Sequence, residues 1–505
     1  MSTTTAARGS EGGAVSLDFP DEVVTRSLLR LVAVPGLDQP AALITLDNGF
    51  DHKKPNTFGP AGLASLDAAI TDALAADPAF IAVTGKPYVF CVGADITGIP
   101  RLTTREQALE IGRLGHRVFA RLRDSAVPTF AFINGAAMGG GLELALHCHY
   151  RTLSSGASAL ALPEVSLGLV PGWGGTQLLP NLIGIAPAAQ VIIQNPLTQN
   201  KMLKPGQAAE MGIADVLLEP ADFLERSLEW AAGVVRGEIS VSRPEIDRDM
   251  WEGVLYFARQ TLDERLHGAV PAAYRALDLL ALAKDADFAT GTAAEDEALA
   301  DLIMTEELRS GLYAFDLVQR RAKRPVGAPS PALARDITKV GIVGAGLMAS
   351  QLALLFARRL EVPVVMTDLD QSRVDKGLAY VRGEIDKLVS KRRLDTGKAA
   401  KLRSLVSGSV DKGVFADAEF VVEAVFEDLG VKKQVWAELE KIVSPETVLA
   451  TNTSSLSVTA MAADLKHPER VVGFHFFNPV AVLPLLEIVR GERTDDATLA
   501  TAFAV

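Results

Sequence analysis

A glycine-rich turn between an apolar run and a helix-like run constrains the second half of this chain more than any other feature. The segment that starts at Lys339 reads KVGIVGAGLMA, with Gly344 and Gly346 in the spacing G-x-G-x-x-A. The apolar residues before the turn predict a strand, and the pattern after it predicts a helix over 347–359. Glycines at such a turn let the backbone approach a phosphate closely, and a helix N-terminus attracts its charge. The pattern therefore predicts a βαβ unit that binds a dinucleotide.

An acidic residue follows at about the spacing that a dinucleotide ribose requires. The predicted strand 362–367 ends in Asp368, 24 residues after Gly344. A carboxylate at this point accepts a hydrogen bond from the ribose 2′-hydroxyl and repels a 2′-phosphate, so NAD is favoured over NADP. A βαβ turn without a ligand is the alternative interpretation. The residues expected at the dinucleotide are Gly344, Gly346, Leu347, Met348 and Asp368.

A second glycine cluster lies in the first half of the chain. Three consecutive glycines near the end of Asn134–Glu143 separate an apolar run from a helix-like run. Backbone N–H groups at such a helix start can approach a ligand and face a developing negative charge. Glu143 falls in the first turn of this helix, and Glu164 follows Pro163 further along. Donors for an oxyanion and two carboxylates are the components of acid–base chemistry next to a carbonyl.

A histidine and a glutamate near the end of the chain form a candidate general base. His475 ends an apolar strand and precedes a turn that contains Pro479, and Glu487 lies near the start of the next strand. A histidine oriented by a carboxylate is the usual base for removing a proton from an alcohol while hydride leaves to a nicotinamide. On spacing alone, a buried histidine satisfied by a backbone carbonyl is an equally good interpretation.

The composition excludes several classes of function. A formal net charge of −12 argues against nucleic acid or an anionic membrane as the main partner. The two cysteines, Cys91 and Cys148, provide no disulfide framework, and residues 1–19 lack the apolar core of a signal peptide. Both features favour a cytoplasmic enzyme. The segment His147–His149 contains two histidines and a cysteine, but no further ligand cluster completes a metal site, so packing is expected there.

The 505 residues are too many for one core, and their pattern divides them into five segments. Residues 1–35 are predicted to be a flexible tail, and alternating short apolar runs and helical patterns predict α/β units over 36–225. Residues 226–323 are predicted to be helical, 324–336 form a proline-rich linker, and 337–505 restart a strand–helix rhythm. The expected strands of the first half include 41–46, 79–84 and 129–133, and the expected helices include 58–76 and 105–124.

The first half resembles the crotonase (enoyl-CoA hydratase/isomerase) family. The resemblance covers residues 40–220 and rests on four segments: Phe90–Ile96, Asn134–Glu143, Pro163–Glu164 and Leu169–Gln177. It implies an α/β fold built as a spiral of ββα units. It also implies that the N–H groups of Ala94 and Gly140 form an oxyanion hole for a thioester carbonyl, and that Glu143 and Glu164 are the catalytic acids.

The second half resembles the NAD-binding domain of 3-hydroxyacyl-CoA dehydrogenases over residues 337–505. The resemblance implies a Rossmann-type domain in which His475 and Glu487 form the catalytic dyad and Ser454 contacts the substrate. The residues that it further implies, beside the dinucleotide or in the same cleft, are Glu427, Lys432, Asn452 and Asn478.

The two halves in this order resemble the multifunctional α-subunit family of fatty-acid β-oxidation. This resemblance implies hydration of a trans-2-enoyl-CoA thioester to (3S)-3-hydroxyacyl-CoA, NAD-dependent oxidation to 3-ketoacyl-CoA, a homo- or hetero-oligomer, and a thiolase subunit as partner. An enoyl-CoA isomerase or a non-catalytic acyl-CoA-binding scaffold are the alternatives; two glutamates favour hydration. The family carries a further helical domain beyond the point that matches Val505. We therefore expect a chain truncated at its C-terminus, with a slow dehydrogenase half.

Overall fold

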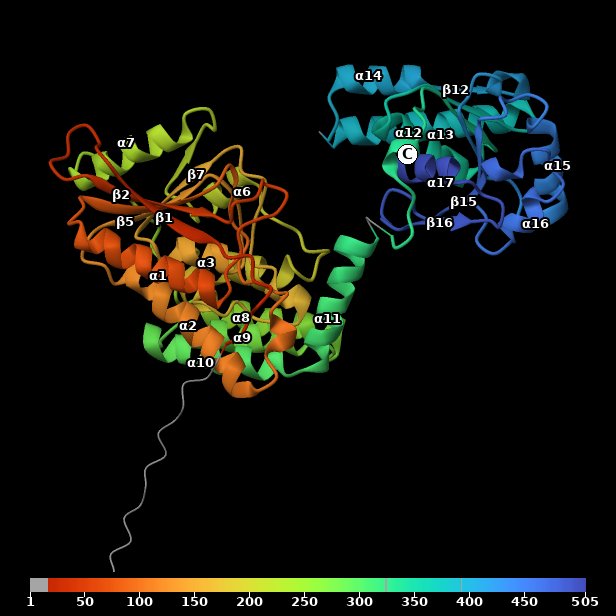
Figure 1. The fold of residues 1–505 in the computed structure, drawn as a ribbon. Coiled ribbons are helices and arrows are strands. Elements are labelled where there is room, and N and C mark those ends of the chain that lie inside the picture. The colour runs from red at the N-terminus through yellow and green to blue at the C-terminus, as the bar shows by residue number, and fades with distance from the viewer. Residues whose placement is uncertain (1–16, 323–324, 392) are drawn as a thin grey trace, which may run out of the picture. The chain divides into compact units, whose positions relative to one another are not determined.

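The computed structural model describes residues 17–322, 325–391 and 393–505, and the chain divides into two compact units (Figure 1). The first unit ends at Arg320, and the second extends from Arg321 to Val505. Both contain a sheet with helices packed against it. Among the described residues, no helix combines the length and the apolar character that a membrane span needs.

A six-stranded sheet organises the first unit, in the order β1-β2-β3-β5-β7-β9. Strand β1 is antiparallel to β2, and the other neighbours are parallel. Phe80 and Ala82 of β3 face helix α7 (Phe223–Val235), whereas Ile81 and Val83 face the larger core, because successive side chains of a strand point to opposite faces. The strands are β1 Arg26–Val32, β2 Ala41–Asp47, β3 Phe80–Gly85, β5 Thr129–Ile133, β7 Tyr150–Ser154 and β9 Val216–Leu218.

Strand β1 corrects the predicted N-terminal tail. The sequence analysis places residues 1–35 in a flexible tail, but Arg26–Val32 pair residue by residue with β2. The strand lies at the edge of the sheet and alternates exposed and half-buried residues. Such a strand lacks the continuous apolar run that identifies the buried strands beside it. Residues 1–16 of the predicted tail lie outside the described residues.

A smaller parallel sheet of β4, β6 and β8 leads into the candidate site. Each of its strands follows a strand of the main sheet along the chain, so β3-β4, β5-β6 and β7-β8 repeat one arrangement with helices between them. The predicted spiral of ββα units is confirmed. The strands are β4 Tyr88–Cys91, β6 Gly135–Met138 and β8 Leu160–Ala161.

The helical region predicted over 226–323 packs, as far as residue 320, into the first unit. Leu299 and Ile303 of α10 share one buried apolar cluster with Phe119 of α2 and Leu142 of α3. Helix α10 lies along α2 (Figure 1). The helices are α1 Pro60–Ala75, α2 Arg105–Arg123, α3 Gly140–His147, α4 Gly175–Ile183, α5 Ile185–Ala189, α6 Pro205–Glu210, α7 Phe223–Val235, α8 Trp251–Leu266, α9 Pro271–Leu282, α10 Phe288–Ile303 and α11 Glu306–Asp316.

A seven-stranded sheet organises the second unit, in the order β12-β11-β10-β13-β14-β15-β16. All neighbours are parallel except β15 and β16. The strand order reverses on either side of β10, which is where open α/β sheets bind ligands at their carboxyl ends. The Rossmann-type prediction is confirmed. The strands are β10 Val340–Val343, β11 Val364–Thr367, β12 Val406–Ser409, β13 Phe420–Glu423, β14 Val448–Thr451, β15 Val471–Phe476 and β16 Leu486–Arg490.

Helices cover both faces of this second sheet, and two separate apolar clusters fill the spaces beneath them. Helix α12 begins and ends at the predicted residues, 347 and 359. The helices are α12 Leu347–Arg359, α13 Gln371–Ser390, α14 Thr396–Leu405, α15 Leu429–Leu439, α16 Val458–Ala462 and α17 Asp496–Ala504.

Candidate active sites

A narrow cavity of about 110 Å³ in the first unit brings together the two glutamates and the two predicted backbone donors. Most of its wall is apolar, which strengthens any charge interaction inside it. The predicted site residues on its wall are Ala94, Gly140, Glu143 and Glu164; apolar residues around them include Ile96, Leu102, Ile111, Leu169, Leu299 and Ile303. The structure therefore places all four predicted residues of this half in one cavity.

The N–H groups of Ala94 and Gly140 are oriented by the segments around them. Phe58 donates its N–H to the carbonyl of Gly93 and accepts from the N–H of Asp95, both at 2.8 Å. The N–H of Ala94, between them, therefore points away from Phe58. Gly140 opens α3, and the first N–H groups of a helix have no partner within it. Gly93 has φ +97°, and a Cβ there would lie 2.8 Å from the Gly140 nitrogen.

Glu143 is buried and held by backbone donors. Its Oε1 accepts hydrogen bonds from the N–H groups of Trp173 and Gly175, both at 2.8 Å. Burial, with the negative charge of Glu295 adding to it, raises the pKa of Glu143 to about 8. This carboxyl group therefore holds its proton far more tightly than an exposed glutamate does.

Glu164 is the first residue of the 3₁₀ helix η2 (Glu164–Leu167), which follows β8 after a short connection that ends in Pro163. Burial, and then the charge of Glu143, raises the pKa of Glu164 well above its usual range. Among the side chains that the structure describes, none hydrogen-bonds the buried Oε2 of Glu164. Two carboxyl groups in one apolar cavity cannot both ionise easily, so the pair retains a proton near neutral pH.

The glycine turn of the second unit approaches the neighbouring strand end closely. Gly344 has φ +114°, and a Cβ there would lie 2.8 Å from the carbonyl oxygen of Ala424. Asp368 ends up beside this turn, since its Oδ2 accepts from the N–H of Ala345 at 2.8 Å. Gly346 caps α12, whose first two residues are Leu347 and Met348. The predicted dinucleotide residues therefore lie together at the carboxyl ends of β10 and β11.

A buried lysine joins two further predicted residues. Lys432 donates to Oε1 of Glu423 at 2.7 Å and lies 3.2 Å from Oε2 of Glu427. Glu427 also accepts from the N–H of Ser454 at 3.1 Å. Although burial opposes it, hydrogen bonds from Thr453 and Lys432 lower the pKa of Glu427. The sequence analysis missed Glu423, the fully buried counter-ion of Lys432.

His475 and Glu487 are directly opposite on β15 and β16. The His475 Nδ1 lies 2.8 Å from Oε2 of Glu487, so the partner of the imidazole is a carboxylate and not a backbone carbonyl. Asn452 accepts from the N–H of Phe476 at 2.9 Å, next to the histidine. Asn478 accepts from Gln351 at 3.2 Å, which connects it to α12.

Comparisons with known families assign both units. Residues 39–244 match the enoyl-CoA hydratase/isomerase family, and residues 339–505 match the NAD binding domain of 3-hydroxyacyl-CoA dehydrogenase. The chain therefore contains an enoyl-CoA hydratase/isomerase domain followed by a 3-hydroxyacyl-CoA dehydrogenase NAD binding domain. This confirms the resemblance that the motifs carry.

Two curated relatives are similar to this chain over most of its length. The fatty acid oxidation complex subunit alpha of Shewanella amazonensis is 33% identical over 478 residues, which cover 92% of this chain and 66% of the relative. The subunit of the same name from Shewanella frigidimarina is 33% identical over 434 residues, which cover 84% and 60%. The chain thus spans less than two thirds of the length of these curated relatives.

Solved structures are similar to a smaller share of the chain. FadB2 of M. tuberculosis is 38% identical, with 33% of this chain and 59% of that chain covered and a TM-score of 0.32. The (S)-3-hydroxybutyryl-CoA dehydrogenase of Ralstonia eutropha is 36% identical, with 34% and 59% covered and a TM-score of 0.33.

The hydratase/isomerase-family unit contains a buried cluster that the sequence analysis missed. Glu295 and Asp296 of α10 contact His116 of α2, and Glu295 also accepts from backbone N–H groups at the start of α4. The helical period indicates this position, because Glu295 shares a face of α10 with the buried Leu299 and Leu302. A glutamate on an apolar face requires buried partners.

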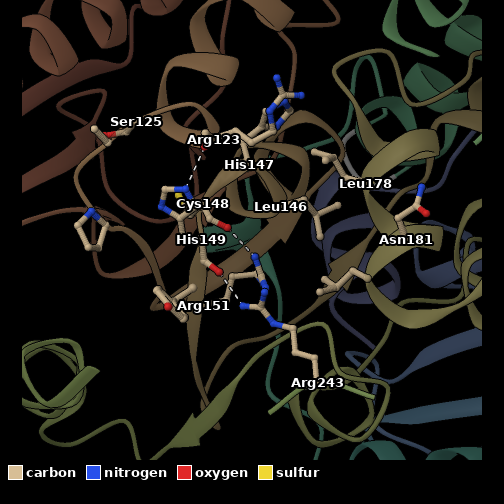
Figure 2. A pocket seen from close by; sticks show the side chains of 14 residues that line it. Arg123, Ser125, Leu146, His147, Cys148, His149, Arg151, Leu178, Asn181 and Arg243 are labelled. Atoms are coloured by element: carbon tan, nitrogen blue, oxygen red, sulfur yellow. Dashed lines mark hydrogen bonds between the residues drawn. The ribbon is translucent and has the colours of Figure 1, made fainter. Parts of the chain in front are cut away.

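The two histidines beside Cys148 hydrogen-bond to nearby residues, and Figure 2 shows the bond from His149 to Arg123. His147 donates through Nδ1 to the carbonyl of Glu143 at 2.9 Å, and burial lowers the pKa of His147 to about 3. His149 accepts from the N–H of Thr129 and donates through Nε2 to the carbonyl of Arg123 at 2.9 Å. Burial raises the pKa of the Cys148 thiol to about 12. Across the described ranges, no three possible ligands gather into a metal site.

Proposed function

We propose that this chain is a bifunctional β-oxidation enzyme. The first unit hydrates trans-2-enoyl-CoA thioesters to (3S)-3-hydroxyacyl-CoA, and the second oxidises that product with NAD to 3-ketoacyl-CoA. The observation that carries the first activity is the cavity in which Glu143 and Glu164, both with raised pKa, lie with the residues whose N–H groups would receive an oxyanion, Ala94 and Gly140. The second activity rests on the His475–Glu487 contact within an NAD-binding domain.

In the hydration step, the thioester carbonyl oxygen accepts hydrogen bonds from the N–H groups of Ala94 and Gly140. Each donor aimed at the enolate-like oxygen is worth about 3–4 kcal/mol in such surroundings. Glu143 takes a proton from water as the water oxygen bonds to the β-carbon, and Glu164 gives a proton to the α-carbon. The unpartnered Oε2 of Glu164 supports this assignment, because that atom is free to exchange a proton with the substrate.

In the oxidation step, NAD fits the residues present in the second unit. A Cβ at Gly346 would meet nothing within 4 Å, so the turn leaves room for a phosphate at the start of α12, and Asp368 stands beside the turn as a carboxylate partner for a ribose hydroxyl. Bound NAD supplies the hydride acceptor. His475 removes the proton of the 3-hydroxyl group through Nε2, because its Nδ1 is engaged by Glu487, which fixes the tautomer and stabilises the imidazolium.

A direct assay separates this proposal from its alternatives. Hydration removes the conjugated double bond, so the absorbance of a trans-2-enoyl-CoA falls when the protein is added, and NADH appears when NAD follows. An isomerase instead raises that absorbance from a 3-enoyl-CoA, and a scaffold changes neither. Glu164→Gln is expected to lose hydration while acyl-CoA binding, measured by calorimetry, survives. Wild-type turnover by this variant would contradict the role of Glu164.

We further propose a cytoplasmic enzyme that works in an oligomer with a thiolase, which consumes 3-ketoacyl-CoA. The name of the curated relatives, which are subunits of a complex, supports an assembly. The two cysteines, both buried and unpaired, fit a reducing compartment. Co-purification of this chain with the thiolase of the same genome, followed by light scattering, tests the partner and the oligomeric state.

A further inference from the structure

Four consecutive N–H groups at the start of α4 alternate between two buried carboxylates. The first and third, within residues 173–176, donate to Oε1 of Glu143. The second donates to Oε2 of Glu295 at 2.7 Å, and the fourth donates to Oε1 of Glu295 at 2.8 Å. The segment therefore lies between the two glutamates, and a shift of the segment away from Glu295 would move both donors of Glu143.

Contacts from α2 and from the start of α4 fix the carboxyl group of Glu295 in this position. Its side chain is fully buried, and it accepts a further hydrogen bond from the hydroxyl of Thr176. His116 of α2 lies with Nε2 3.0 Å from Oε2 of Glu295 and with Nδ1 2.8 Å from Oδ1 of Asp296. An imidazole between two carboxylates donates to both when it is protonated. Although burial opposes it, the hydrogen bonds to Asp296 and Glu295 raise the pKa of His116 to about 9.

The helix that carries His116 leaves space for this arrangement. A Cβ at Gly112 would lie 2.7 Å from Oδ1 of Asp296, and a Cβ at Gly115 would lie 2.2 Å from Nε1 of Trp173. The Trp173 indole instead donates to the carbonyl of Ile111 at 3.2 Å, on the same helix. Helices α2 and α10 therefore hold the segment 173–176 through both its backbone and its tryptophan.

We propose that Glu295 is a positioning residue for the hydration: it holds the segment 173–176 through the N–H groups that alternate with those bonded to Glu143, and so determines where the Glu143 carboxyl group stands. The inference rests on the proposed hydratase function. Glu295 touches no reacting atom in this scheme. It acts on Glu143 through the backbone of the segment 173–176, whose N–H groups donate to both carboxylates. Glu295 lies in helix α10, outside the four segments on which the resemblance to the crotonase family rests.

The charge of the cluster has a second consequence, for the ionisation of Glu143. The charged groups that act on Glu143 are Glu295, Glu164 and the protonated His116, whereas His147 on the same helix is neutral. Replacing Glu295 by glutamine removes a negative charge, so Glu143 would ionise at lower pH. Replacing His116 by glutamine removes a positive charge, so Glu143 would ionise at higher pH.

The test measures hydration kinetics across pH for the 505-residue protein and three variants. For Glu295→Gln we expect kcat to fall about 10- to 100-fold with KM little changed, as for a displaced catalytic group. Its acid limb of kcat should move to lower pH. For His116→Gln the limb should move to higher pH, which tests the proposal even if the first variant fails to fold. Glu297→Gln, on the same helix but half exposed, is the matched control and should match the wild type.

The outcomes separate the inference from the proposed function. Suppose that the wild type hydrates enoyl-CoA, and that Glu295→Gln and His116→Gln both keep its kcat and the acid limb of its pH profile. That result leaves the proposed function intact and overturns the positioning role. A lowered kcat with unmoved limbs in both variants also overturns it, since loss of general stability predicts that result. No hydration of any enoyl-CoA by the wild type overturns the proposed function and this inference with it.

Discussion

Replacing Glu143 by glutamine should abolish hydration and yet make the first unit more stable at alkaline pH. Glutamine has the shape of a protonated glutamate, and its carbonyl oxygen can still accept from the N–H groups of Trp173 and Gly175. It cannot take a proton from water. The variant therefore removes the chemistry of Glu143 and keeps its hydrogen bonds.

The magnitude of the stability effect follows from the pKa of Glu143. Folding raises this pKa from 4.5 to about 8, so the folded protein keeps a proton that the unfolded chain releases. The contribution of Glu143 to the free energy of unfolding is therefore fully present below pH 4.5. It decreases as the pH rises from 4.5 to about 8 and is constant above that pH. At about 1.4 kcal/mol per pKa unit, the loss reaches at most about 5 kcal/mol. Glu143→Gln lacks this loss.

Denaturant unfolding at pH 6 and pH 9, followed by tryptophan fluorescence, measures the effect. Trp173 lies next to the substituted residue and reports on the first unit. We expect the free-energy difference between Glu143→Gln and the wild type to grow by a few kcal/mol in favour of the variant from pH 6 to pH 9. A difference that stays constant, or an acid limb of wild-type hydration near pH 4.5, would refute the reasoning about the buried pair.

Three further substitutions test other parts of the two sites. Gly93→Ala would place a Cβ 2.8 Å from the Gly140 nitrogen; we expect a 10²- to 10³-fold lower kcat of hydration, as for loss of one oxyanion donor, and a tenfold change or less would contradict that role. His475→Gln should abolish NADH formation and leave hydration unchanged, whereas loss of both would argue against separate sites. Asp368→Ser should weaken NAD binding and improve NADP binding in fluorescence titrations; an unchanged ratio of the two affinities would remove Asp368 from the ribose site.

The sequence predicts those parts of the fold that depend on short-range patterns. Strand 129–133 and helix 347–359 were predicted with the bounds that the structure has, because a continuous apolar run and a glycine turn identify them locally. The four predicted residues of the first site reach one cavity because the ends of β4, β6 and β8 meet at one edge of a sheet. Local motifs were sufficient there.

The remaining features depend on contacts between distant segments. Strand β1 pairs at the edge of its sheet and carries no run of buried residues, so its pattern resembles a tail. Glu295 reaches His116 across 179 positions, and Glu423 meets Lys432 from a different element. Each charge is buried with a partner that is selected only by the packing of a helix against another helix or against the sheet. A single sequence shows the charged residue but not its partner.

The absorbance of a trans-2-enoyl-CoA, followed after addition of the wild type, Glu143→Gln or Glu164→Gln, tests the central claim most directly. We predict that the wild type removes this absorbance and that neither variant does, although both still bind the thioester. Loss of the absorbance at equal rates with all three proteins would contradict the account, because the reaction would then not depend on the two buried carboxyl groups.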